Sequence, residues 1–78
     1  MEYIALFHTQ SGAIKFHKTL AGKELEAQML PVPRKLSSSC GIAVKFSYDD
    51  DIIGLISADV EKIYEINGSE YSLFYEVE

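Results

Sequence analysis

A chain of 78 residues has room for one domain and not for a second hydrophobic core. Hydrophobic residues make up 47% of the chain, which excludes a disordered protein, and no apolar run approaches the roughly 18 residues of a membrane span. The net charge of −5 argues against general nucleic-acid binding, because that function needs a basic surface.

The start of the chain predicts a strand followed by a helix. Residues 3–8 form a continuous apolar run of strand length, which indicates a strand in the middle of a sheet and not a signal peptide. Thr9 or Ser11 offers a hydroxyl to cap a helix, and apolar residues recur at helical spacing through residues 11–21. Gly22 is expected to take the left-handed conformation that ends the helix.

Two further strands follow, joined by a loop. Residues 25–29 alternate between apolar and polar side chains, which is the period of a strand, and Pro31 and Pro33 end it. The segment PRKLSSSCG has no periodicity and predicts a loop. Residues 42–46 then alternate as a third strand.

The second half of the chain predicts a helix and a last strand. Four apolar residues step at helical spacing, and they are Ile52, Ile56, Val60 and Ile63. They predict a helix over residues 49–66 that Asn67-Gly68 ends. The alternative is a short strand at residues 52–56 before a helix at 58–66. Alternation over residues 71–77 predicts the closing strand.

The order βαββαβ predicts an α+β domain of the ferredoxin-like, split βαβ type that spans residues 1–78. Its four-stranded antiparallel sheet would have the strand order 4-1-3-2, with both helices on one face. The other face would stay open and partly apolar, so we expect a homodimer, or another docked protein, on that face.

Cys40 is the only cysteine, which excludes an internal disulfide and favours a reducing cytoplasm. The residues around it have the types that a reactive thiol needs, and they are Arg34, Lys35, Ser37, Ser38, Ser39 and Gly41. The two cations would favour the thiolate, the serines bring hydroxyl donors, and the glycine permits close approach. The alternative is that Cys40 is a small apolar residue that packs at a strand end.

The charges of the chain are unevenly placed. Residues 1–47 hold six Lys and Arg against three Asp and Glu, a net charge of +3. Residues 48–78 hold one against nine, a net charge of −8. Because Cys40 lies in the first part, an anionic partner would be attracted there, and the acidic remainder is most simply a solubilising face.

Other candidate groups carry weaker signals. His8, at the end of the first strand, could pair with Cys40 if their strands are neighbours, or it could be a strand-end residue without a role. His17 is expected at the surface of the first helix. Residues 49–51 are all Asp, and they fit helix capping better than cation binding. No metal-ligand spacing is present, so we expect neither a metal nor a cofactor.

Three segments together resemble a family of short bacterial and archaeal proteins described as selenium/sulfur carrier-like. They are FHT at the end of the first strand, LPVPRKLSSSCGIAVKF, and INGSEY before the last strand. The resemblance spans almost the whole chain, and its most specific part is the PR-x-x-SSSCG pattern. It implies that Cys40 accepts sulfur or selenium, with Arg34, the serines and Gly41 as its setting.

Three functional hypotheses follow. In the first, the chain is a carrier, not an enzyme, that holds a persulfide or its selenium equivalent on Cys40 and relays it between donor and acceptor proteins in the cytoplasm. In the second, it is a non-catalytic ferredoxin-like interaction module in which Cys40 is structural. In the third, it is a thiol-based redox regulator. None of them involves nucleic acid or a membrane.

Overall fold

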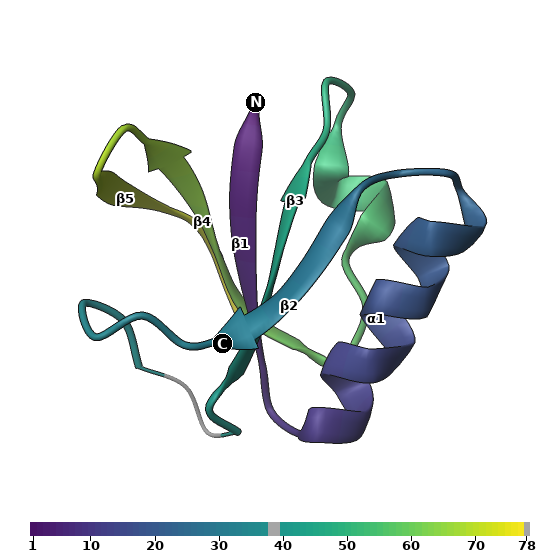
Figure 1. The fold of residues 1–78 in the computed structure, drawn as a ribbon, viewed down its shortest axis with the longest axis horizontal. Coiled ribbons are helices and arrows are strands. Elements are labelled where there is room, and N and C mark those ends of the chain that lie inside the picture. The colour runs from purple at the N-terminus through teal and green to yellow at the C-terminus, as the bar shows by residue number, and fades with distance from the viewer. Residues whose placement is uncertain (38–39, 78) are drawn as a thin grey trace.

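The computed structural model describes residues 1–37 and 40–77. They form one antiparallel sheet of five strands in the order β2-β3-β1-β4-β5, with a single α-helix packed on one face (Figure 1). The elements in chain order are β1 (Glu2–Phe7), α1 (Gln10–Gly22), β2 (Ala27–Pro31), β3 (Ile42–Ser47), the short 3-10 helix η1 (Ile52–Leu55), β4 (Val60–Asn67) and β5 (Glu70–Glu76).

The central strand β1 holds the two halves of the core together. It pairs with β3 on one side and with β4 on the other, and its five residues after Glu2 are all buried. Tyr3, Ala5 and Phe7 belong to the cluster under α1, whereas Ile4 and Leu6 belong to a second cluster on the opposite face. An apolar run without alternation is therefore a strand covered on both sides, as the sequence predicted.

Helix α1 begins and ends with recognisable caps. The hydroxyl of Thr9 accepts a hydrogen bond from the amide of Gly12 at 3.1 Å, so Thr9 is the N-cap. At the other end the amides of Glu24 and Leu25 donate to the carbonyls of Ala21 and Leu20, both at 3.0 Å, which is a Schellman motif. Glu24 is the residue with a positive φ, 61°. The prediction that Gly22 closes the helix was wrong, because Gly22 is still helical.

The predicted four-stranded sheet of order 4-1-3-2 with two helices is wrong. Residues 60–66, the later part of the helix predicted over residues 49–66, belong to β4 and lie beside β1, and the predicted last strand is β5 at the edge. Val, Ile and Tyr favour strands, and pairing with β1 buries Val60 and Ile63. Gly68, with φ 63°, opens a tight turn between β4 and β5, so Asn67-Gly68 is a hairpin signal and not a helix end.

The segment between β3 and β4 crosses the face that α1 covers. It contains η1, so neither the long helix nor the extra strand considered for this region is formed. Asp51 caps η1, since its carboxylate accepts a hydrogen bond from the amide of Ile53 at 3.0 Å. Ile52 is buried in the cluster under α1. One buried isoleucine therefore anchors a crossover that the sequence suggested was helical.

The second face of the sheet is partly covered by the loop after β2. Its buried residues Ile4, Leu6 and Ala43 pack against Val32 and Leu36 of that loop, and against side chains of β2, β4 and β5. In Figure 1 the loop and the β4–β5 hairpin extend toward the same side, away from α1. The apolar centre of this face is therefore buried within the chain, and is not the exposed surface on which the expectation of a homodimer rested.

Candidate functional site

Cys40 is a free, half-buried cysteine two residues before the start of β3. It packs at the margin of the cluster under α1. Its Sγ lies 3.3 Å from the carbonyl oxygen of Ile42, to which it donates, and 3.5 Å from the amide nitrogen of Ile42, from which it accepts. The carbonyl contact needs the sulfur-bound proton, whereas the amide contact is available to thiol and thiolate alike. The thiol is thus held against the backbone of Ile42, the first residue of β3.

Gly41 and Val32 close the base of the loop that carries Cys40. The amide of Val32 donates to the carbonyl of Gly41 at 3.1 Å, immediately beyond the last β2–β3 pair, Pro31 with Ile42. Gly41 has φ 74°, a left-handed conformation that other residues adopt only with strain. An added Cβ would meet nothing within 4 Å, so backbone conformation and not space requires glycine here. The backbone conformation therefore requires a glycine at position 41, next to the thiol.

The two predicted cations lie on the loop, but neither contacts the thiol in the described part of the chain. Arg34 is exposed in the turn that the hydrogen bond from the amide of Leu36 to the carbonyl of Pro33 closes at 2.9 Å. The Nζ of Lys35 donates to the carbonyl of Ser69 at 3.2 Å, across the sheet in the β4–β5 turn. The structure thus brings Lys35 to the hairpin and not to Cys40.

The remaining predicted site residues divide into those described and those not. Ser37 is exposed, whereas Ser38 and Ser39 lie outside the described residues. His8 is exposed at the end of β1, and its amide donates to the carbonyl of Asp59 at 3.3 Å. No hydrogen bond joins its ring to Cys40 within residues 1–37 and 40–77. The start of β3 and the start of α1 do lie at the same end of the molecule, where the helix dipole is positive (Figure 1).

A hollow that was not predicted from the sequence lies beneath the loop after β2, on the face of the sheet opposite α1. It has a volume of about 350 Å³ and is lined by Lys35, Leu36, Tyr64, Glu70 and Tyr71. The rings of Tyr64 and Tyr71 meet edge to face, with their centres 6.5 Å apart. One signal could have revealed it: Leu36 is an apolar residue in an otherwise polar stretch, and such a residue needs a partner to cover it.

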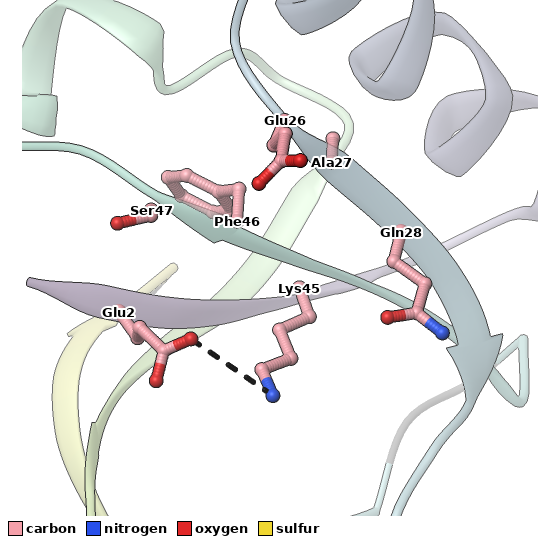
Figure 2. Close-up of a pocket in the computed structure, with 7 residues that line it drawn as sticks. All are labelled: Glu2, Glu26, Ala27, Gln28, Lys45, Phe46 and Ser47. Carbon is pink, nitrogen blue, oxygen red and sulfur yellow. Dashed lines mark ion pairs between the residues drawn. The ribbon is translucent and has the colours of Figure 1, made fainter.

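A second hollow, of about 300 Å³, lies where the start of β2 faces the start of β1 and the end of β3 (Figure 2). Figure 2 shows the side chain of Lys45 extended toward Glu2, with 4.0 Å between Nζ and Oε2. Both side chains are largely exposed, and such a pair contributes only about 0–1 kcal/mol. The lining contains neither cysteine nor histidine, so this hollow is separate from the thiol.

Within residues 1–37 and 40–77, no three His, Cys, Asp or Glu side chains come together as a metal site would require. The same residues contain no helix with the length and apolar character needed to cross a membrane.

The structure is that of a small domain with one helix on a five-stranded antiparallel sheet, and a free cysteine next to a central strand. Residues 2–76 match the model of the family described as "putative Se/S carrier protein-like", and the chain belongs to this family. The resemblance carried by the PRKLSSSCG segment is thereby confirmed. No curated protein and no solved structure matches the chain. A carrier passes its cargo to other molecules, so family membership implies partner proteins.

Proposed function

We propose that this protein carries sulfur, or selenium in the same oxidation state, on the Sγ of Cys40. The family match over residues 2–76 is the observation that carries the proposal. A carrier needs a thiol that a partner can reach, and Cys40 is a free thiol at a loop end that is not fully buried. It needs no substrate pocket of its own, because the chemistry is completed by the donor and the acceptor.

The transfer step is an exchange between sulfur atoms. The thiolate of Cys40 attacks the outer sulfur of a persulfide on the donor, a new S–S bond forms, and the donor's own thiolate leaves. No net oxidation occurs, since the transferred sulfur keeps its oxidation state. Delivery is the same reaction in reverse, in which an acceptor thiolate attacks the outer sulfur on Cys40. A perselenide would follow the same course.

The surroundings of Cys40 indicate how such a cargo would be accommodated. Loading begins from the thiolate, so the contact of Sγ with the carbonyl of Ile42 must be given up, whereas the contact with the amide of Ile42 can persist. In the proposed loaded state the outer sulfur would be an anion, which the guanidinium of Arg34 can bind. Arg34 is exposed and makes no ion pair among the described residues, so its guanidinium is available to a persulfide anion.

The second candidate function is an interaction module in which Cys40 is structural. It is favoured by one observation, the packing of Cys40 against the core cluster with its sulfur engaged by the backbone of its own strand. The two candidates differ in a property that can be measured. A carrier thiol reacts in the folded protein, and a packing thiol reacts only when the chain opens.

The test is to incubate the folded protein with inorganic polysulfide and to record its intact mass. The carrier proposal expects a gain of one sulfur atom that dithiothreitol reverses and that Cys40→Ser abolishes. Arg34→Ala should slow the rate at which polysulfide loads Cys40 by about 1.5- to 5-fold, the effect of losing one exposed charge interaction with the persulfide anion that forms. Lys23→Ala removes an equal charge at the far end of α1 and should leave the rate unchanged.

The same experiment distinguishes the candidates. If Cys40 takes up neither sulfur nor iodoacetamide until urea unfolds the chain, the thiol is a packing residue and the carrier proposal fails. A homodimer through the face opposite α1 stays a prediction, and sedimentation of the purified protein tests it directly.

A further inference from the structure

The two edges of the sheet differ in whether they are closed to another strand. At the β2 edge, Pro31 lacks an amide hydrogen, and the ring of His17 contacts the carbonyl oxygen of Ala27 at 3.1 Å. Helix α1 runs alongside that strand (Figure 1). At the β5 edge, Glu70–Glu76 contains no proline and pairs with β4 alone among the described strands. The edge formed by β5 is therefore the one that another strand can join.

Apolar side chains in and just after β5 are also exposed to solvent. Leu73 is 53% exposed and Phe74 is 44% exposed, and Val77 just beyond the strand is 39% exposed. Natural sheets usually cover such an edge or interrupt it, because unpaired backbone groups and apolar side chains together recruit other chains. Pairing with β4 is regular from Glu70 to Leu73 before the register shifts, so four consecutive residues offer an unbroken edge.

The charges around this edge select the kind of partner. The β4–β5 hairpin carries Glu61, Glu65, Glu70 and Glu76 against the single cation Lys62. An acidic hairpin attracts a basic segment and repels an acidic one.

A second copy of this chain fits the edge poorly. Two β5 strands paired with each other would bring together two hairpins that each carry four glutamates and one lysine, and the like charges repel. Pairing β5 with the β2 edge of another copy meets Pro31 and the His17 contact. The remaining occupant is a segment of a different protein.

We propose that β5 is a docking edge that takes up an extended, lysine- or arginine-bearing segment of a partner protein as a sixth strand. Backbone hydrogen bonds would supply affinity, and the glutamates and Leu73 would select the side chains. One end of the docked segment lies beside Ser69, whose carbonyl binds Lys35 from the loop that leads to Cys40. The docking edge does not depend on what Cys40 carries.

The test uses the full chain, labelled with ¹⁵N, and a soluble peptide of seven residues in which lysine and valine alternate. Binding should shift the amide signals of residues 70–73, slow their hydrogen exchange, and weaken as salt is added. A peptide of the same sequence with alternate backbone nitrogens methylated keeps its charge and loses its donors. Its affinity should fall about tenfold or more, because two or more backbone hydrogen bonds are lost. A glutamate–valine peptide should not bind.

Two variants of the protein complete the test. Glu70→Lys should weaken binding of the lysine peptide roughly threefold or more, whereas Asp50→Lys, the same change of charge at an exposed site outside the sheet, should leave it within about twofold. Cys40→Ser should bind as well as the natural chain, which separates this proposal from the carrier function. Equal binding of the methylated peptide, or signals that shift around residues 49–51 in place of 70–73, would overturn the proposal.

Discussion

Leu36 links the cysteine loop to the face of the sheet opposite α1, so replacing it tests whether the packing there holds the loop. Leu36 is half-buried and packs against the cluster of Ile4, Leu6 and Ala43. Leu36→Ala removes the equivalent of three methylene groups, each worth about 0.8 kcal/mol when fully buried. Because Leu36 is only partly buried, we expect the free energy of unfolding to fall by about 1–2 kcal/mol.

The loss should appear in urea unfolding and as a fall in melting temperature of roughly 5–15 °C for a domain of this size. Leu73→Ala is the matched control, since Leu73 is a leucine of β5 that is 53% exposed, and it should change stability by less than about 0.5 kcal/mol. A loosened loop should also raise the rate at which iodoacetamide labels Cys40 in the folded protein. If Leu36→Ala is no more destabilising than Leu73→Ala, the loop is not held by this packing and the reasoning fails.

Two further predictions concern glycines and the ends of α1. Gly22→Ala should stabilise the protein by roughly 0.5–1 kcal/mol, and Glu24→Gly by a similar amount, because Gly22 is helical with open space around it and Glu24 carries the positive φ. Thermal unfolding tests which of the two residues has the left-handed conformation. If that residue were Gly22, Gly22→Ala would lower the melting temperature. Gly12→Ala should cost about 1–2 kcal/mol despite alanine's better helix propensity, because the new Cβ would lie 2.8 Å from the Cβ of Asp59. An unchanged midpoint in urea would show that Asp59 moves aside freely.

The place of Cys40 in the fold was predicted from the sequence, whereas the contacts of its loop were not. The lone cysteine in a loop before an alternating strand located Cys40 correctly, because both features are local in the sequence. The partners of the loop are not local. Lys35 reaches Ser69, 34 residues away in the sequence, and no pattern within the loop specifies that contact.

Local periodicity determined most of the first half of the fold. The predicted strands at residues 3–8 and 42–46 correspond to β1 and β3, and the helix at 11–21 corresponds to α1. The strand predicted at residues 25–29 overlaps β2, which lies two residues later and includes Pro31. These segments combine one clear period with a turn or cap signal at each end, so the local and tertiary preferences agree. The strand at residues 71–77 was found for the same reason, although its neighbour in the sheet was not.

Only the tertiary structure decided residues 49–67. Ile52, Val60 and Ile63 are spaced as on a helix, yet all three reach the cluster under α1 from a 3-10 turn and a strand. A short series of apolar residues fits either a helix or a strand, and which one forms depends on whether a neighbouring strand is available to pair with it. One side of β1 was free to pair, and β4 fills it with partners 53 to 64 residues away in the sequence, a distance over which no local pattern carries information. The sequence by itself therefore determined the elements that local pattern specifies, together with the cysteine and its family, while long-range pairing decided the sheet.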